Sequence, residues 1–375
     1  MAKWIPLLLK ILGASLLLLV FTGWLLLRTL NFFPPVERNE KVLCTGRKPQ
    51  TLKPGSRIRI LIWNIQYGGS RKYHFFYDGG KHVHAEKQIV QQNLQDIRKV
   101  IQKQNPDIVL FQEIDRRSTR SAYIDQLEAL WDPKAFACYT TTPYFKSKYV
   151  PTPSHQHMRE VDMHLTIFSK FKLQNAVRYA LPQLNESFLR RTFNLKRAIL
   201  RTHIPIEGET QPFVLLNTHL SAFSFGDGTL QKQVSKVQSI VQRSQQKKAF
   251  WFLAGDFNML PPQDHPKRLG KDGDYYNPPK TNPILALFQD YQSGLKLEVY
   301  KQNPTLYNTY IPFAAKQPDR WIDHVFTHKD IKVERYQVLQ TFLSDHLPIL
   351  VDVRLPSNTK NEKTTPAPSK SAPTR

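Results

Sequence analysis

The sequence contains very little cysteine, with only Cys44 and Cys138 in a chain of 375 residues. Two cysteines exclude a multi-cysteine zinc site and a framework of several disulfides. We predict two unrelated free thiols, and a disulfide between them, which an exported chain would permit, is the alternative.

Acidic residues are also scarce, since 53 Lys and Arg stand against 30 Asp and Glu and give a formal net charge of +23. Residues 1–57 hold nine basic and two acidic residues, and residues 356–375 hold four and one, so the segment between them still carries +13. Partners that carry phosphate, either nucleic acid or anionic lipid, are therefore favoured over basic partners. The 41% of hydrophobic residues is enough for a substantial core and excludes a wholly disordered chain.

Long apolar runs are confined to the N-terminus, where residues 11–27 contain no charge and the apolar stretch reaches back to Trp4 if Lys10 extends its ammonium group to the surface. This is about the minimum length for a helix that spans a bilayer. A cleaved signal peptide is the competing interpretation, but no small-x-small cleavage site follows the run. We predict a single-pass membrane anchor over residues 1–28, in contact with the membrane through residues 4–27. Basic residues flank both ends, so the orientation stays open, with the exported side favoured for the rest of the chain.

The remaining chain divides by composition. Residues 29–57 are polar and contain proline, which predicts a linker, and residues 356–375 have no large apolar side chain, which predicts a disordered tail. Residues 58–355 then form one catalytic domain. Short apolar segments within it predict buried strands, and the 3.6-residue spacing of Leu94, Ile97 and Ile101, and of Val234, Val237 and Val241, predicts helices. This mixture indicates a layered α/β architecture. The predicted strands cover residues 58–64, 108–111, 165–168, 198–202, 213–216, 250–254, 321–326 and 349–353.

Polar residues that suit phosphate chemistry follow several of these strands. Glu113 closes an otherwise apolar strand, and one or two carboxylates suffice to hold Mg²⁺, which keeps waters and substrate phosphate as its other ligands. Asp256 and Asn258 follow a strand that ends in glycine, so a carboxylate and an amide two residues apart can hold a water or a phosphate oxygen. Each feature alone is as typical of a solvated strand end or an Asx turn.

Two histidines complete the candidate set. Asn217 and His219 share the two-residue spacing at the end of a strand, and both can donate to a phosphate oxygen. Asp345 and His346 precede another strand, and an aspartate such as Asp323 can fix the tautomer of the His346 imidazole and raise its basicity.

Six segments hold these residues and their neighbours, in the order Leu61-Ile-Trp-Asn-Ile, Asp107-Ile-Val-Leu-Phe-Gln-Glu-Ile, Asn217-Thr-His-Leu, Leu253-Ala-Gly-Asp-Phe-Asn, Ile322-Asp-His-Val-Phe and Ser344-Asp-His-Leu-Pro-Ile. In this order the segments resemble the endonuclease/exonuclease/phosphatase superfamily, which includes deoxyribonucleases, apurinic endonucleases, inositol-polyphosphate phosphatases and neutral sphingomyelinases. Six ordered segments are far more specific than any one of them. One departure is Gln66, which stands two residues after Asn64 where apurinic endonucleases carry an Asp that helps the metal, and it argues against that branch.

The resemblance implies a fold of the α/β (α+β) class, a four-layered α/β/β/α sandwich with the metal site at the common edge of its two sheets. It implies Mg²⁺ as cofactor, with Mn²⁺ as an alternative. Either Asp256 or His346 would be the general base. The metal ligands would be Glu113, Asn64 and Asp345, the phosphate-binding residues Asn64 and Asn217, and the catalytic residues Asp256, His346, His219, Asn258 and Asp323.

The predicted function is a membrane-tethered, Mg²⁺-dependent phosphodiesterase of the sphingomyelinase type that acts on a lipid head group, with no obligate protein partner. The tether favours lipid, and Tyr144, Phe145, Phe223 and Phe225, in expected loops, are candidate lipid contacts. A DNA or RNA endonuclease is the alternative, and a phosphomonoesterase would need the same residues. A non-catalytic binding module is the alternative of another class. The nuclease alternative rests on a basic cluster of Arg190, Arg191, Lys196, Arg197 and Arg201.

Overall fold

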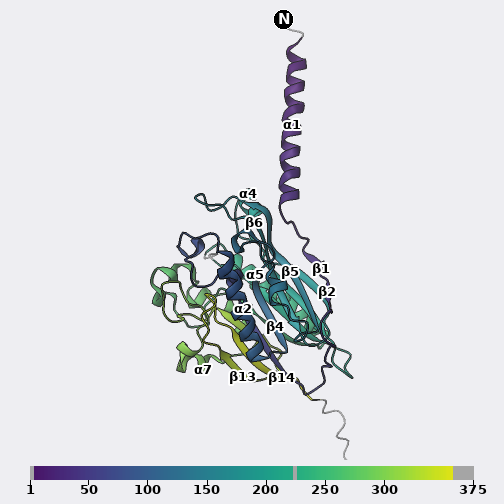
Figure 1. Cartoon of the computed structure of the whole chain (residues 1–375), viewed down its shortest axis with the longest axis vertical. Helices are drawn as coiled ribbons and strands as arrows, with labels where there is room; N and C mark the ends of the chain where they lie inside the picture. Colours follow the sequence, from purple (N-terminus) through teal and green to yellow (C-terminus); the bar gives the residue numbers. More distant parts are fainter. Residues whose placement is uncertain (1–3, 223–225, 358–375) are drawn as a thin grey trace, which may run out of the picture.

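The computed structural model describes residues 4–222 and 226–357, and it shows one N-terminal helix projecting from a layered body (Figure 1). This helix, α1 (Ile5–Leu30), has 26 residues and no buried side chain. At 1.5 Å per residue it is ~39 Å long, which exceeds the ~30 Å thickness of a bilayer's hydrocarbon core. Length and composition make it a candidate membrane span, and a signal sequence near the N-terminus would meet the same criteria. The predicted tail lies outside the described residues from residue 358 onward.

Two mixed seven-stranded sheets form the body. The pairs β3–β4 and β9–β10 are parallel, and the other strand pairs are antiparallel. Sheet I has the order β1 (Glu37–Asn39), β7 (Gln174–Ala180), β8 (Ala198–Ile204), β9 (Phe213–His219), β10 (Phe250–Asp256), β12 (Asp323–Thr327) and β11 (Gln292–Ser293). Sheet II has the order β13 (Lys332–Val338), β14 (Ile349–Arg354), β3 (Arg57–Asn64), β4 (Ile108–Asp115), β6 (Arg159–Ser169), β5 (Cys138–Val150) and β2 (Val42–Leu43).

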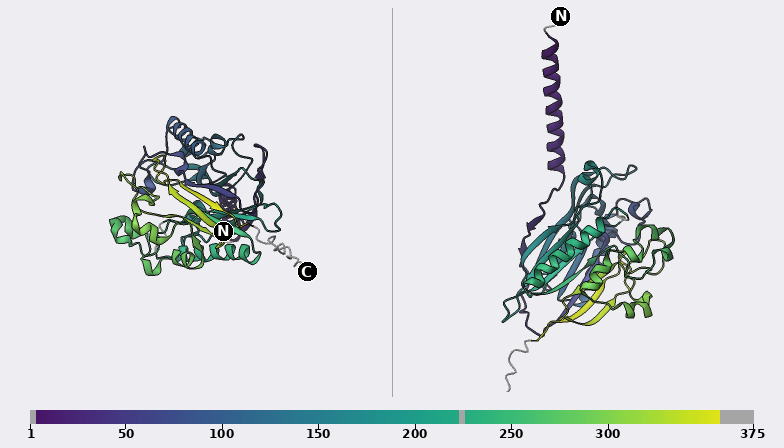
Figure 2. Two further views of the ribbon diagram at one scale, coloured as in Figure 1. Left: turned by 90° about the horizontal axis from the view of Figure 1, so that it is seen from below. Right: turned by 180° about the vertical axis from the view of Figure 1, so that it is seen from behind.

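Alternation along the strands explains the layers. On β3, Ile60 and Ile62 belong to the core between the sheets, whereas Leu61 and Trp63 pack under helices on the outer face. Helices α2 (Lys87–Gln104) and α3 (Gln126–Leu130) cover the outer face of sheet II. Helices α5 (Thr229–Gln246) and α6 (Ile284–Asp290) cover that of sheet I, as the view from behind in Figure 2 shows for α5. The predicted four-layered α/β/β/α sandwich is therefore confirmed. Two further short helices are α4 (Phe188–Phe193) and α7 (Leu297–Gln302).

The two helices predicted from the spacing of apolar residues form at the predicted positions, as α2 and α5. In α2, Leu94, Ile97 and Ile101 are buried on one face, and the helix ends at Asn105, which adopts a left-handed conformation (φ 46°) directly before Pro106. Asparagine tolerates this conformation better than most residues, and proline cannot continue the helix. The tight ending returns the chain to β4, which carries Glu113.

The segment expected to be a linker, residues 29–57, contributes strands to both sheets. Strand β1 pairs with β7 in sheet I, and β2 pairs with β5 in sheet II. The polar composition of this segment concealed two short edge strands, which need few apolar residues because one side of each faces solvent.

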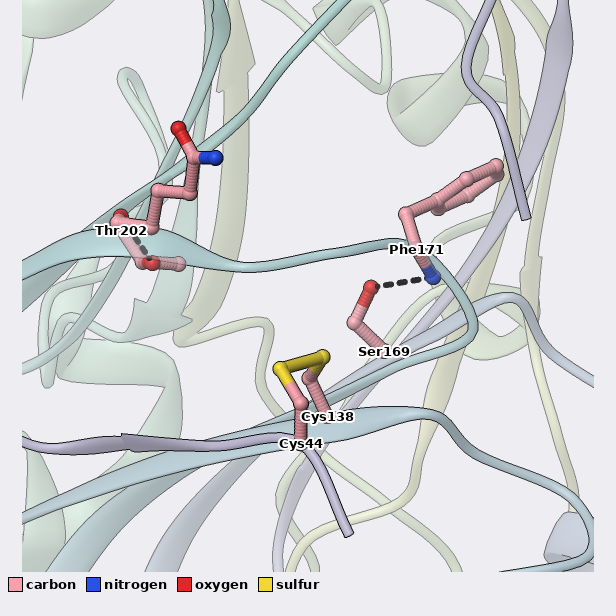
Figure 3. Close-up of a disulfide and its surroundings, with 6 residues drawn as sticks. Cys44, Cys138, Ser169, Phe171 and Thr202 are labelled. Carbon is pink, nitrogen blue, oxygen red and sulfur yellow. Dashed lines mark hydrogen bonds between the residues drawn. A yellow bond between two sulfur atoms is a disulfide. The ribbon is translucent and has the colours of Figure 1, made fainter. Parts of the chain in front are cut away.

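The prediction of two free thiols is wrong, because Cys44 and Cys138 form a disulfide (Figure 3). The strand pairing explains the bond. Leu43, the last residue of β2, lies opposite Tyr139 of β5, so Cys44, which follows β2, comes to face Cys138, the first residue of β5. The Cα atoms of the two cysteines are 4.0 Å apart. Because β2 was not expected from the sequence, nothing there brought the two cysteines together.

Candidate active site

Strand register brings polar residues from three strands of sheet I into one row. Asp256, the last residue of β10, lies opposite His219 of β9 and Asp323 of β12. On sheet II, Asn64 ends β3 opposite Gln112 of β4. The strand ends of both sheets meet at a common edge, as the family resemblance implied.

Gly255 permits the close approach of β9 and β10 at this edge. It has a φ of +146°, and a Cβ atom there would lie 1.9 Å from the carbonyl oxygen of Thr218. A side chain would push the strands apart one residue before Asp256. The glycine therefore sets the spacing between Asp256 and His219.

A β-bulge orients Glu113. The pairing of β4 with β6 shifts register between Phe111 and Ile114, and Glu113 within this shift has a left-handed backbone (φ 60°). A bulge turns a side chain that would otherwise continue the alternation of the strand. One carboxylate oxygen of Glu113 accepts a hydrogen bond from the Asn64 Nδ2 atom at 3.2 Å. Glu113 thus faces the site instead of packing beneath a helix.

The Asp256 carboxylate contacts side chains from both sheets. Its Oδ2 atom accepts a hydrogen bond from Asn64 Nδ2 at 3.1 Å and lies 3.2 Å from His219 Nε2 and 3.6 Å from His346 Nε2. Its Oδ1 atom accepts the backbone N–H of Asn258 at 2.9 Å. Burial raises the pKa of Asp256 to about 7, and the nearby charge of Asp323 adds to this against the opposing charge of His346. A carboxyl group with such a pKa can take up or release a proton near neutral pH.

His346 and Asp323 form the pair that the sequence analysis inferred. The His346 Nδ1 atom lies 2.7 Å from Asp323 Oδ2, and the His346 backbone carbonyl accepts a hydrogen bond from the Trp63 indole at 3.0 Å. Burial by itself lowers the pKa of His346, but the charges of Asp323 and Asp256 outweigh it and raise this pKa well above 6.5. The two carboxylates therefore favour the protonated form of the imidazole.

His219 has the opposite character. Burial, followed by the charges of Arg197 and His346, lowers the pKa of His219 well below 6.5. Its Nδ1 atom lies 3.0 Å from the hydroxyl of Tyr144. The surroundings of the two histidines beside Asp256 thus act in opposite directions, because burial favours the neutral form of His219 and the carboxylates favour the protonated form of His346.

Oxygen atoms suited to a metal gather around Asp345. Its carboxylate accepts hydrogen bonds from Gln66 Nε2 at 2.9 Å and from the Ser344 hydroxyl at 3.1 Å. Burial, together with the charge of Glu113, raises the pKa of Asp345 to about 7. The Gln66 Oε1 atom is buried without a hydrogen-bond partner among the described residues. A second group, formed by Asp256, Asp323 and His346, has one potential ligand atom from each residue within 4.8 Å of the others.

The two predicted phosphate-binding residues differ in accessibility. Asn217 is fully buried between the sheets, where its amide donates to the carbonyl oxygens of Phe111 and Thr166 and accepts from Gln112. Both donor hydrogens are engaged by backbone, so Asn217 joins the sheets. Asn64 lies at the site, with its amide nitrogen toward Glu113 and Asp256 and its oxygen accepting the Gln66 backbone N–H at 3.0 Å.

The site opens into a cavity of about 1020 Å³. Its lining includes the apolar residues Phe145, Met158, Leu189 and Phe193. The volume exceeds what a phosphate group alone would need. The catalytic candidates on its surface are Glu113, His219, Asp256, Asn258, Asp345 and His346.

A family model described as the Endonuclease/Exonuclease/phosphatase family matches residues 61–346, which contain five of the six segments in full and the sixth as far as His346. The chain belongs to the endonuclease/exonuclease/phosphatase family. Members of this family are hydrolases that act on phosphate esters. The resemblance recognised in the sequence is thereby confirmed.

Solved structures share this fold at low sequence identity. An endonuclease/exonuclease/phosphatase family protein from Beutenbergia cavernae is 20% identical with a TM-score of 0.52, over 80% of this chain and 72% of that chain. The human Nocturnin catalytic domain with a bound sulfate anion is 18% identical with a TM-score of 0.51, over 84% and 97%. A family protein from Bacteroides vulgatus is 15% identical with a TM-score of 0.52, over 80% and 99%. Identities this low show the fold alone. None of the curated protein sequences matches the chain.

Arg197 lies at the site, although the sequence indicated it only as part of a basic cluster. It lines the cavity, its guanidinium lies 5.7 Å from the ring centre of Tyr144, and its Nη1 atom is buried without a hydrogen-bond partner among the described residues. An unpaired guanidinium N–H beside Asp256 and His219 is suited to a phosphate oxygen. Its position directly before β8 gave no sequence signal.

The rest of the basic cluster does not form one face. Arg190 and Arg191 of α4 line the cavity with Arg197. Lys196 is instead buried and donates to backbone carbonyls at the end of α4, and the Arg201 guanidinium lies 5.1 Å from the Tyr179 ring centre.

Two of the four predicted lipid contacts are buried. Tyr144 and Phe145 lie in β5 and are not loop residues, with exposed fractions of 0% and 4%. Tyr144 instead holds His219, a role that the sequence could not show because 75 residues separate the two. Phe223 and Phe225 lie outside the described residues.

Proposed function

We propose that the chain is a membrane-tethered, divalent-metal-dependent phosphodiesterase that acts on the head group of a membrane lipid. The observation that carries the hydrolytic part is the convergence of Asn64, His219 and His346 on Asp256, inside a cavity that also presents Glu113. Family membership supports phosphate-ester hydrolysis, and α1 supports the tether.

Glu113 and Asp345 would hold the metal, with the unpartnered Gln66 Oε1 atom as a further oxygen donor. Carboxylate and amide oxygens are the ligands that Mg²⁺ and Mn²⁺ prefer, so the donor set fits either ion. The cation would neutralise the negative charge of the phosphate oxygens. In this assignment the Asn64 amide orients the Glu113 carboxylate.

The protein's own groups would move the proton and stabilise charge. Asp256, or His346 in its deprotonated form, takes the proton of the attacking water, and Asp256 Oδ2 and His346 Nε2 lie 3.6 Å apart at the cavity surface. Asp323 fixes the His346 ring from behind, while neutral His219 and Arg197 donate to the phosphate oxygens. Asn258 holds the Asp256 carboxylate through its backbone N–H.

A lipid head group is favoured over nucleic acid as the substrate. The apolar residues Phe145, Met158, Leu189 and Phe193 in the cavity lining suit the acyl-linked end of a lipid better than a polyanionic backbone. The nuclease alternative loses support because only Arg190, Arg191 and Arg197 of the basic cluster reach the cavity. The phosphomonoesterase alternative uses the same residues, and the complete set of them argues against a non-catalytic binding module.

The Cys44–Cys138 disulfide favours the exported side of the membrane for the body, because disulfides persist in oxidising compartments. Maleimide labelling of chain isolated without reductant tests this, since an exported body leaves both thiols unreactive. Full labelling of two thiols would place the body on the reducing side.

Hydrolysis assays on a panel of substrates test the proposed function. Because β1 and β2 precede the predicted domain boundary, the full chain in lipid nanodiscs is the suitable sample. It is incubated with Mg²⁺ and separately with sphingomyelin, phosphoinositides, plasmid DNA, RNA and a phosphomonoester, alongside Glu113→Ala and the exposed control Glu128→Ala. We expect release of a lipid head group that Glu113→Ala abolishes and Glu128→Ala retains. Cleavage confined to DNA or RNA, or to the monoester, would contradict the lipid assignment.

A further inference from the structure

The chain that directly follows α1 is attached to β5 by hydrogen bonds, which fixes where α1 joins the body. Asn31, which follows α1, pairs with Ser147, whose hydroxyl donates to Asn31 Oδ1 at 2.8 Å. The next residue, Phe32, donates its backbone N–H to the carbonyl oxygen of Lys146 at 3.2 Å. With α1 in a membrane, this contact decides which end of the body faces the bilayer.

Helix α4 lies at that same end. Figure 1 shows it at the part of the body nearest to α1. A second cavity of about 430 Å³ agrees with this, because it is lined by Arg28 of α1 and Phe33 just after α1, and also by Phe188 and Arg191 of α4. The helix and the base of the anchor are therefore neighbours.

The exposed face of α4 has the composition of a membrane-interfacial segment. Phe188 and Leu189 are 54% and 58% exposed although they are large and apolar. Arg190 and Arg191 follow them directly on the helix. Apolar side chains beside arginines bind the boundary between acyl chains and anionic head groups.

The helix is braced from the protein side. Ser187 caps its first turn by accepting the Arg190 backbone N–H, Thr192 is buried, and Lys196 donates to the carbonyl oxygens of Thr192 and Asn194. With its inner side fixed in this way, α4 presents Phe188 and Leu189 outward.

We propose that α4 docks on anionic phospholipids of the membrane that α1 enters, with Phe188 and Leu189 in the interface and Arg190 and Arg191 bound to lipid phosphates. The proposal rests on the membrane tether of the proposed function. Leu189, Arg190 and Arg191 also line the catalytic cavity, so docking holds that cavity against the bilayer from which a lipid head group would enter.

Fluorescence of a single labelled cysteine tests this docking in the full chain. The native cysteines are disulfide-bonded, so a fluorophore sensitive to polarity attaches selectively to Leu189→Cys. The matched control is Leu306→Cys, which is 54% exposed and lies four residues after the end of α7. Figure 1 shows α7 at the end of the body away from α1. Both variants are placed in nanodiscs of phosphatidylcholine, with or without phosphatidylglycerol, and with doxyl-labelled lipid as quencher.

We expect the label at residue 189 to shift to the blue and lose intensity to the lipid quencher, more so with phosphatidylglycerol, while the label at residue 306 does neither. Arg190→Gln with Arg191→Gln should remove the effect of the anionic lipid. Equal, water-like emission at both positions would overturn the proposal. It would also be overturned if the label at residue 189 is already blue-shifted in detergent and is not quenched by the doxyl-labelled lipid in nanodiscs.

The outcome is separable from that of the hydrolytic assignment. In a Glu113→Ala background, the quenching at residue 189 should persist unchanged although hydrolysis is lost. A chain that does not enter nanodiscs, as judged by co-elution, would overturn the tether and this docking together while leaving the hydrolytic site untouched.

Discussion

The Nδ1 atom of His346 lies 2.7 Å from the Oδ2 atom of Asp323, and both side chains are buried. This contact orients the ring so that its Nε2 atom faces Asp256 at 3.6 Å. A histidine with a fixed ring and a raised pKa beside a second carboxylate is suited to work on a phosphate ester.

Replacement of Asp323 by asparagine should expose the role of His346. The variant removes one of the anions that raise the pKa of His346 and keeps the burial that lowers it, so this pKa falls. We expect kcat to drop by ~10²-fold or more. If protonated His346 is required, the alkaline limb of the rate profile moves to lower pH, because the proton is lost earlier.

If His346 is instead the base, its deprotonated form is required, and the limb that moves to lower pH is the acidic one. That result would also mean that Asp256 is not the base. The measurement is kcat against pH for the wild type, Asp323→Asn and the exposed control Asp330→Asn. A profile of unchanged shape and height in Asp323→Asn would rule out the pair as part of the site.

Gly255→Ala should damage the fold at the site itself. The added Cβ meets the backbone oxygen of Thr218, which no rotamer change can relieve, so we expect a loss of unfolding free energy of about 3 kcal/mol. Gly208→Ala is the matched control, because Gly208 also has a positive φ but nothing within 4 Å, and it should lose about 1 kcal/mol. Denaturant unfolding of the two variants compares them, and equal losses would refute the steric explanation.

Arg197→Gln should weaken productive substrate binding without unfolding the chain. The variant loses a charged donor whose Nη1 atom has no protein partner among the described residues, so kcat/KM should fall by ~10–100-fold. Arg201→Gln is the control, since Arg201 stacks on Tyr179 away from the cavity. Steady-state kinetics and thermal unfolding of both variants check this, and an Arg197→Gln enzyme with wild-type kcat/KM would remove Arg197 from the site.

Much of the fold followed from local patterns in the sequence. The apolar strands, the face of α2 and the polar residues at strand ends were readable because each depends on residues close together in the chain. The row formed by His219, Asp256 and Asp323 is a consequence of strand ends that meet at one edge.

Features that depend on pairing between distant segments could not be read in this way. The disulfide forms only because β2 pairs with β5, and the hydroxyl that contacts His219 belongs to Tyr144 of the other sheet. The Asn217 side chain points between the sheets, where its oxygen accepts a hydrogen bond from Gln112 of the opposite sheet. The orientation of Glu113 depends on a bulge that the neighbouring residues in the sequence do not indicate.

The dependence of hydrolysis on Mg²⁺ and on Glu113 tests the central claim most directly. With the lipid substrate from the panel, kcat/KM is measured for the wild type, Glu113→Gln and the exposed control Glu128→Gln, before and after chelation by EDTA. We expect EDTA to abolish turnover reversibly and Glu113→Gln to lower kcat/KM by more than ~10²-fold, because loss of a direct ligand costs more than loss of an outer-shell partner. Hydrolysis that survives EDTA, or that is the same in Glu113→Gln as in Glu128→Gln, would contradict a metal-dependent site built on Glu113.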